Sequence, residues 1–262
     1  MLEQITPLIL TYNESNNIER TLSKLYWAKD IVIVDSFSTD DTLEKAGRVH
    51  SVRIYQRVFD THANQWNFGL QQTNILTDWV LALDADYVLQ DDFIEEMRCF
   101  QPDGMVDGYR ARFRYCQFGK PLRGSLYPPV TVLYRRELAG YVQDGHTQRI
   151  IVKGKIENLK TKIYHDDRKP LSHWLQSQDR YMRIEVKKVY GSSWRELGWA
   201  NRLRKLVVLA PFIVFIYCLV VKRGGLDGMR GLFYALQRML AETLLSIRLA
   251  EIYLTQEMEK DE

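Results

Sequence analysis

Short apolar segments alternate with helix-like segments through the first 84 residues of the chain. The helix-like segments carry apolar residues at spacings of three and four, as at Ile18, Leu22 and Leu25. The strand-like segments are residues 5–10, 31–34, 52–55 and 79–83. Strands that are apolar throughout and alternate with helices are typical of a mostly parallel sheet covered on both faces, which binds ligands at the carboxyl ends of its strands. We therefore expect an α/β fold.

The alternation weakens after residue 100. Further strands are indicated at residues 108–115, 130–135, 149–152 and 159–164. They predict an antiparallel or mixed extension of the same sheet, and from Pro170 onward the pattern is helical. The sequence thus predicts one domain over residues 1–169, in two parts (1–100 and 101–169), followed by a helical region over 170–262.

Charge is distributed unevenly. Residues 1–100 hold 8 Lys or Arg and 16 Asp or Glu, and residues 101–262 hold 28 and 17. An acidic site beside a phosphate group needs a divalent cation, and a basic half suits phosphates or an anionic bilayer, although an unevenly charged solvated surface is the alternative. The three cysteines have neither paired spacing nor a CxxC motif, so we expect a reducing compartment. The first residues lack the features of a signal peptide, so we expect the first domain in the cytoplasm.

Asp84-Ala85-Asp86 directly follows the apolar segment 79–83. Two carboxylates at positions i and i+2 of a strand end can both reach one hard cation. Mg²⁺ or Mn²⁺ accepts such oxygen ligands and keeps positions for pyrophosphate oxygens. Acidic residues at strand ends also cap helices or lie in solvated turns, so the surrounding segments decide between these interpretations.

Three further segments precede Asp84-Ala85-Asp86 in a fixed order: Leu-Thr-Tyr-Asn-Glu at 10–14, Val-Asp-Ser-Phe-Ser-Thr-Asp-Asp-Thr at 34–42 and Ala-Asn-Gln-Trp-Asn-Phe-Gly at 63–69. Together the four resemble the motifs of the family 2 glycosyltransferases, whose second motif is usually V-D-S-G-S-T-D-G-T. The resemblance covers residues 5–90 most clearly and extends to about 168. It implies a Rossmann-like GT-A fold, a nucleotide-sugar donor, and transfer with inversion at the anomeric carbon.

The resemblance also implies that six residues bind the nucleotide: Thr11, Tyr12, Glu14, Asp35, Gln65 and Asn67. Tyr12 would stack on the base and Glu14 would accept hydrogen bonds from ribose hydroxyls. Asp35 would accept from the N–H of a uracil ring, and the two amides would lie near the ribose or the phosphates. A helix cap at Asp35 and a helix-surface amide at Asn67 are the alternatives.

Two positions depart from the family pattern. Phe37 and Asp41 stand where the family usually has glycine. A glycine at position 37 would supply a backbone angle that phenylalanine resists. An additional carboxylate at Asp41, in the first turn of a helix, is favourable.

Transfer to a hydroxyl needs a general base. Relatives resembling lipopolysaccharide-core β-glucosyltransferases often carry His-Glu near residues 142–149, but here Thr147 follows His146. We therefore predict Asp144 as the base, with His146 orienting it or binding the acceptor; a hairpin turn at 144–145 is the alternative. Farther along, His165 could complete the metal shell with Asp84 and Asp86, and Arg168 or Lys169 could neutralise the leaving diphosphate.

The C-terminal region contains 16 residues without a charge, 206–221, between Arg or Lys residues on both sides. Pro211 and the short length argue against a simple membrane crossing, which takes about twenty residues. Gly224 and Gly225 permit a reversal before an amphipathic helix. The sequence predicts a helical hairpin at one membrane leaflet; a buried hairpin packed on the first domain, or on a second copy in a homo-oligomer, is the alternative. The tail resembles that of bacterial membrane-associated family 2 enzymes.

These features predict an inverting, metal-dependent glycosyltransferase at the cytoplasmic face of the inner membrane. It would move a hexose from a UDP-sugar, with Mg²⁺ or Mn²⁺, to a hydroxyl of a lipid-linked glycan in bacterial envelope polysaccharide synthesis. We expect no nucleic-acid partner. The alternatives are a polyprenyl-phosphate glycosyltransferase, whose anionic acceptor needs no base, and a non-catalytic, membrane-docked protein that binds nucleotide sugars or serves as a scaffold.

Overall fold

Two units make up the chain. The computed structural model describes residues 2–99, 105–144 and 147–261. The first unit comprises Met1–Pro121 and Tyr127–Lys169, and the second comprises Leu122–Leu126 and Pro170–Glu262.

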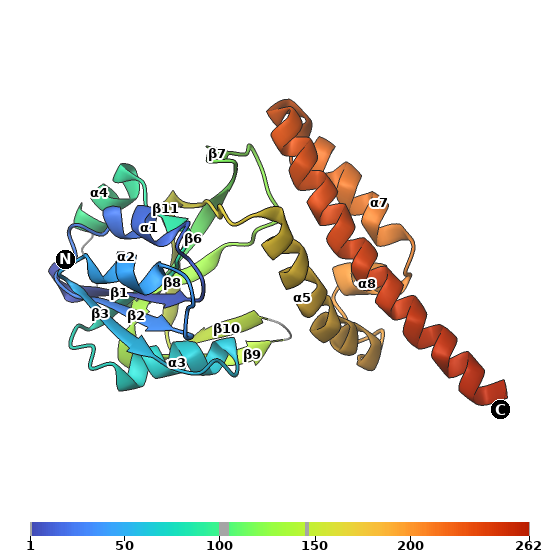
Figure 1. Ribbon diagram of the computed structural model, residues 1–262, viewed down its shortest axis with the longest axis horizontal. Helices are drawn as coiled ribbons and strands as arrows, with labels where there is room; N and C mark the ends of the chain where they lie inside the picture. Colours follow the sequence, from blue (N-terminus) through green and yellow to red (C-terminus); the bar gives the residue numbers. More distant parts are fainter. Residues whose placement is uncertain (1, 100–104, 145–146, 262) are drawn as a thin grey trace. The chain divides into compact units, whose positions relative to one another are not determined.

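The apolar segments of the first 84 residues form adjacent parallel strands of one sheet (Figure 1). In the order in which they lie side by side, they are β3 (Val52–Gln56), β2 (Ile31–Asp35), β1 (Ile5–Thr11) and β4 (Trp79–Asp84). In β2, β1 and β4 nearly all side chains are buried on both faces of the sheet, which is why these three segments are mostly apolar. The edge strand β3 is half-exposed and carries the polar residues Arg53 and Gln56. The predicted α/β fold is confirmed.

The sheet continues beyond β4 as the predicted mixed extension. Its further strands, in spatial order, are β8 (Val130–Arg135), β6 (Val106–Gln117), β11 (Lys155–His165) and β5 (Tyr87–Val88), and β7 (Lys120–Pro121) pairs with β6. β8 runs antiparallel to β4 and β6, whereas β11 runs parallel to β6. A separate antiparallel hairpin is formed by β9 (Ala139–Asp144) and β10 (Thr147–Val152), so the prediction that residues 149–152 extend the main sheet was wrong.

Different elements cover the two faces of the sheet. On one face, helices α1 (Ile18–Ser23), α2 (Thr42–Gly47) and α4 (Asp91–Cys99) bury their apolar residues. On the other, helix α3 (His62–Gln72) packs together with residues of the β9–β10 hairpin. Gly69 allows α3 to approach β1 closely, because a Cβ atom there would lie 2.8 Å from Leu8 Cδ1. Short 3-10 turns occur at Leu2–Gln4 and Arg136–Leu138.

The second unit is helical, as expected. It contains α5 (Leu171–Gly191), α6 (Trp199–Lys205), α7 (Leu209–Ile216) and α8 (Met229–Asp261), with a π-helical turn at Tyr217–Val221 and a 3-10 turn at Gly224–Asp227. The reversal between α7 and α8 depends on two glycines, because a Cβ atom on Gly231 would lie 1.8 Å from the carbonyl oxygen of Gly224. No helix in the described ranges is both long enough and apolar enough to cross a membrane.

Candidate active site

The carboxyl ends of three parallel strands bring the first predicted site residues together. Thr11 of β1 pairs in register with Asp35 of β2, and Leu10 of β1 pairs with Asp84 of β4. The loops that follow these strands therefore begin side by side at one edge of the sheet. This is the edge at which open α/β sheets bind their ligands.

Asp35 organises the two loops that follow β1 and β2. It is completely buried, and its carboxylate accepts hydrogen bonds from Thr11 Oγ1 (2.8 Å), from both the backbone N and Oγ of Ser38, and from Gln56 Nε2. A uracil N–H could reach this carboxylate only if one of these internal donors moved away. The structure thus gives Asp35 a clear role in holding the loops, while its contact with a base stays a prediction.

Tyr12 and Phe37 lie on the two loops that Asp35 joins, and about half of each side chain is exposed. The loops are also linked by Asn13, whose backbone N donates to Ser38 Oγ (2.9 Å) and whose side-chain oxygen accepts from the backbone N of Thr39 (2.8 Å). Phe37 has a φ of 61°, the left-handed conformation for which glycine is suited. Phe37 thus adopts a conformation that suits glycine, and it presents an exposed aromatic ring.

Gln65 and Asn67 make internal contacts. Gln65 is fully buried and donates to Ser36 Oγ and to the backbone oxygen of Arg57, while its oxygen accepts from the Arg57 guanidinium. Asn67 forms two 2.9 Å hydrogen bonds with the backbone N and O of Tyr141, and so ties α3 to β9. Both amides therefore hold the scaffold around the site, and their predicted nucleotide contacts remain untested.

The acidic part of the site contains Asp84, Asp86 and His165. Asp86 follows β4, and His165 ends β11, which pairs with β5 so that Tyr87 lies opposite His165. This pairing places His165 Nε2 3.0 Å from Asp86 Oδ2, with both side chains mostly buried. The rings of Tyr87, Tyr115 and Tyr127 pack around the imidazole, with centroids 4.6–5.3 Å from its own.

Burial and mutual repulsion set the protonation of these groups. Burial, together with the negative charge of Asp86, raises the pKa of Asp84 to about 6. Burial acts in the same direction on Asp86, but the charge and hydrogen bond of His165 outweigh it and lower the Asp86 pKa. Burial acts to lower the pKa of His165, because it disfavours the charged imidazole. The carboxylate of Asp86 outweighs this effect, so the pKa of His165 is raised. The pair is therefore stabilised as an ion pair within an acidic cluster.

The donor atoms present fit a hard divalent cation. Asp86 Oδ1 and His165 Nδ1 are buried and make no hydrogen bond to any described residue. A buried carboxylate oxygen without a donor is costly unless a cation or another donor satisfies it. No group of three potential His, Cys, Asp or Glu ligands is preassembled in the described ranges. Asp84 and Asp86 could hold Mg²⁺ or Mn²⁺ by two carboxylates, and ligation by His165 stays a prediction.

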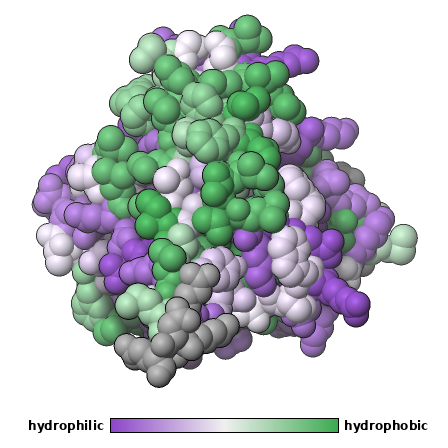
Figure 2. All heavy atoms as spheres, turned by 90° about the vertical axis from the view of Figure 1, so that its right-hand side faces the viewer, coloured by the Kyte–Doolittle hydropathy of each residue, from purple (hydrophilic) through white to green (hydrophobic). Residues whose placement is uncertain are grey.

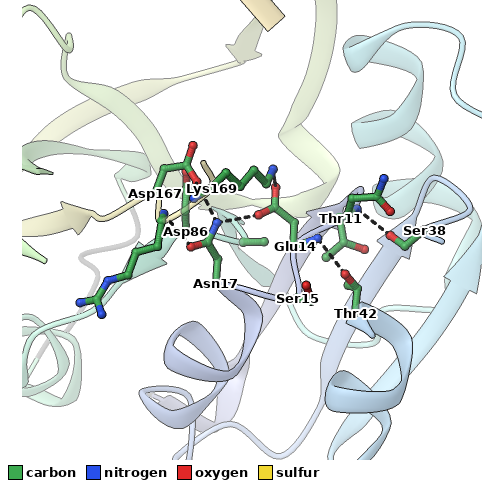
Figure 3. A network of polar contacts seen from close by, with 12 residues as sticks. Thr11, Glu14, Ser15, Asn17, Ser38, Thr42, Asp86, Asp167 and Lys169 are labelled. Atoms are coloured by element: carbon green, nitrogen blue, oxygen red, sulfur yellow. Dashed lines mark hydrogen bonds and ion pairs between the residues drawn. The ribbon is translucent and has the colours of Figure 1, made fainter. Parts of the chain in front are cut away.

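Glu14 meets Lys169 next to this cluster (Figure 3). The Lys169 ammonium is bonded to the Glu14 carboxylate, and the Asn17 amide donates both to Glu14 (2.8 Å) and to Asp167 (3.0 Å). Burial raises the pKa of Glu14 to about 7. The positive charge of Lys169 opposes this increase, and the negative charge of Asp86 adds to it. The loop after β1 is thereby joined to the end of β11, 155 residues later in the sequence.

Arg168 is turned toward a different partner. Its guanidinium binds Asp166 Oδ2 at 2.8 and 2.9 Å, and nearly half of its side chain is exposed. Of the cations after β11, Lys169 is the one joined to Glu14. The sequence indicated Lys169 by its place at the end of the run Tyr-His-Asp-Asp-Arg-Lys. The role of Asn17 could not be predicted, because its partners are distant in the sequence.

The predicted base lies at the end of a hairpin. Asp144 is the last residue of β9 and pairs in register with Thr147 of β10. Side chains alternate along a strand, so Asp144 shares its face with the exposed Val142 and not with the buried Tyr141. β9 and β10 pair as an antiparallel hairpin, the turn at 144–145 lies partly outside the described residues, and the catalytic role of Asp144 stays a prediction. His146 lies outside the described residues.

The fold and the acidic site define an α/β protein of the GT-A class. A mannosyltransferase from Pyrobaculum calidifontis, solved in complex with GDP-Man and Mn²⁺, has a similar fold, with a TM-score of 0.55 at 14% identity over 93% of this chain and 87% of that chain. The sequence profile described as "Glycosyl transferase family 2" matches residues 8–152. The chain belongs to this family.

Two curated relatives show how far the similarity extends. An uncharacterized glycosyltransferase of Rickettsia conorii is 25% identical over 172 residues, which cover 63% of this chain and 60% of the relative. A poly-β-1,6-N-acetyl-D-glucosamine synthase of Staphylococcus aureus is 35% identical over 99 residues, or 35% of this chain and 24% of the synthase. The chain thus spans about three fifths of the first relative's length. The narrower resemblance to lipopolysaccharide-core β-glucosyltransferases stays a prediction.

Proposed function

We propose that this chain is an inverting glycosyltransferase that moves a hexose from a UDP-sugar to a hydroxyl of a lipid-linked glycan in bacterial envelope polysaccharide synthesis. Membership of family 2 supports sugar transfer. The observation that carries the proposal is the buried Asp86–His165 pair beside Asp84, at the carboxyl edge of the parallel sheet. Such a concentration of buried carboxylates requires positive charge, which a divalent cation bound between the carboxylates and a diphosphate would supply.

The donor site would combine a cation with residues of two loops. Asp84 and Asp86 would hold Mg²⁺ or Mn²⁺, which when bound supplies positive charge to the departing diphosphate. Lys169 brings a second positive charge close to the same cluster, because its partner Glu14 lies within the electrostatic reach of Asp86. The half-exposed rings of Tyr12 and Phe37 offer surfaces on which a nucleobase could stack.

The acceptor determines whether a base is needed. A hydroxyl must lose its proton as it attacks, and Asp144 is our proposed base. The polyprenyl-phosphate alternative is favoured by one observation: alternation along β9 puts Asp144 on the face opposite Tyr141, which lines a cavity together with Asp84. An acceptor that is already an anion requires no base.

Replacing Asp144 by Asn separates the two acceptors. Transfer from a UDP-sugar by wild type and by Asp144→Asn should be measured with a lipid-linked glycan and with polyprenyl phosphate. With a hydroxyl acceptor, we expect the variant to lose about 10²–10⁴-fold in turnover. A wild-type enzyme that uses only polyprenyl phosphate, with little effect of the substitution, would refute the hydroxyl-acceptor proposal.

We further propose that the helical unit docks on the cytoplasmic leaflet of the inner membrane. Figure 2 shows apolar side chains gathered over one face of the molecule. Exposed apolar residues are concentrated on α7 and the following turn: Leu209, Phe212, Ile213, Ile216, Val220 and Val221. Basic residues suited to anionic headgroups flank this segment, although Arg204 is engaged internally, with its guanidinium 2.6 Å from Glu242.

Vesicle flotation tests this docking. The full chain should float with vesicles containing anionic lipid, and Phe212→Ser with Ile216→Ser should weaken this binding at least about tenfold, because apolar burial drives it. Leu76→Ser, which removes an even more exposed apolar residue from the first unit, is the control. Equal flotation of all three proteins would contradict docking through α7.

A further inference from the structure

A cavity of about 50 Å³ lies beside Asp84. Trp66 of α3 and Tyr141 of β9 line it, and their rings are stacked with centroids 5.3 Å apart. Residues of β4, β8 and β10 complete the walls, including Ala82 and Gln148. One water needs roughly 10–15 Å³ of such space, so the cavity has room for a group of a few heavy atoms.

Trp66, which lines this cavity, carries an unused donor on its indole ring. Trp66 is only 3% exposed, and its Nε1–H donates to no residue in the described parts of the chain. An indole N–H that is buried in this way usually has an acceptor, because a buried donor without a partner has lost its hydrogen bond to water and gained none in return. Trp27 shows the ordinary arrangement, since its Nε1 donates to the backbone oxygen of Lys24 at 3.1 Å.

The position of the cavity indicates which ligand could supply the acceptor. The argument rests on the proposed function, in which Asp84 helps to hold the donor's diphosphate through a cation. The sugar is the group bonded directly to that diphosphate, so it must lie close to Asp84. The cavity is too small for a whole hexose, but it could receive one substituent of the ring, and its walls combine apolar side chains with polar groups.

We infer that this cavity receives an oxygen-bearing substituent of the transferred sugar and that the Trp66 indole N–H donates a hydrogen bond to that oxygen. Hydroxyl, hydroxymethyl and acetamido groups share this chemistry. Trp66 would then contact the sugar and not the nucleotide. Its contribution should appear as the difference in affinity between a nucleotide sugar and the corresponding nucleoside diphosphate.

Trp66→Phe removes the indole N–H but keeps an aromatic ring beside Tyr141. Affinities should be measured by calorimetry with Mn²⁺ for UDP, UDP-glucose, UDP-galactose and UDP-N-acetylglucosamine, and for GDP and GDP-mannose. We expect the variant to bind the nucleoside diphosphate as wild type does, and to bind the preferred nucleotide sugar about 3- to 10-fold more weakly. The control, Trp27→Phe, loses an indole N–H with an internal acceptor and should leave both affinities unchanged.

The outcomes separate this inference from the proposed function. If wild type binds none of the nucleotide sugars, both fail. If wild type binds one of them and Trp66→Phe keeps the full difference between sugar and diphosphate, the inference alone fails. A second readout does not depend on comparing affinities: the Nε1–H resonance that disappears in Trp66→Phe should shift in wild type with the nucleotide sugar beyond its shift with the diphosphate. An equal shift with both ligands would also overturn the inference.

Discussion

The carboxylate of Asp86 lies 3.0 Å from Nε2 of His165, although the two residues are 79 positions apart in the sequence. The contact exists because β5, directly after Asp86, pairs with the end of β11. It joins the first part of the sheet, where the family motifs lie, to the mixed extension. The effect of this contact on the pKa of His165 can be measured on the metal-free protein.

Replacing Asp86 by Asn should lower the pKa of His165. The carboxylate now raises that pKa against the effect of burial, so its removal leaves burial to disfavour the charged ring. We expect a decrease of at least about one unit, measured by NMR titration of the imidazole without added metal. Asp91→Asn, which removes an exposed carboxylate paired with Lys24, should leave the titration unchanged. An unchanged pKa in Asp86→Asn would contradict the ion pair.

Glu14 should make stability depend on pH. Its pKa is about 7 in the folded protein, and its ordinary value, which applies to the unfolded chain, is 4.5. Between these pH values the folded chain holds a proton that the unfolded chain releases. The free energy of unfolding therefore falls as pH rises through this window. Urea unfolding should show Glu14→Gln gaining stability relative to wild type from about pH 5 to about pH 7.5. A constant or opposite difference would disprove the raised pKa.

The left-handed backbone at Phe37 should be measurable as strain. A φ of 61° disfavours residues other than glycine and asparagine by about 1–2 kcal/mol. Phe37→Asn should therefore raise the free energy of unfolding by up to about 1 kcal/mol, and β-branched Phe37→Val should lower it by a similar amount. Tyr26→Asn, at an exposed site without positive φ, should give no gain. Identical stabilities for the two Phe37 variants would contradict the strain.

Asn67 should matter for the hairpin more than for the nucleotide. Asn67→Ala removes both hydrogen bonds to the backbone of Tyr141, and we expect it to cost about 1–3 kcal/mol in unfolding free energy. The substitution should accelerate backbone hydrogen exchange more in β9 than in β1. Gln71→Ala, an exposed amide on the same helix, serves as the control. A large loss of nucleoside diphosphate affinity without a loss of stability would instead support the predicted nucleotide contact.

The fold was accessible from the sequence because its signals are local. The run that ends at Asp84 reads as a buried strand, and the strand indeed ends there. The loop at Phe37 was marked by a missing glycine, and the structure keeps the glycine-like angle. Strand-end positions of acidic residues could likewise be read directly, because a parallel sheet aligns its carboxyl ends.

The roles of individual polar residues could not be read in the same way. Asn67 binds backbone atoms 74 positions away, and Glu14 pairs with Lys169 across 155 positions. Such contacts depend on the packing of whole elements, which periodicity does not encode. The same holds for Asp35, whose complete burial among loop donors is decided by how two loops meet. Sequence motifs therefore located the site but did not distinguish its scaffold from its ligand contacts.

Calorimetric titration of the full chain with UDP- and GDP-sugars, with and without Mn²⁺, shows whether Asp84 and Asp86 form a metal-dependent donor site. Asp84→Ala with Asp86→Ala is compared with Asp91→Ala plus Asp92→Ala, an exposed acidic pair on α4. We expect Mn²⁺-dependent binding that the first double variant loses and the second keeps. Binding that is independent of Mn²⁺, or equal in both double variants, would rule out a metal-dependent site at Asp84 and Asp86.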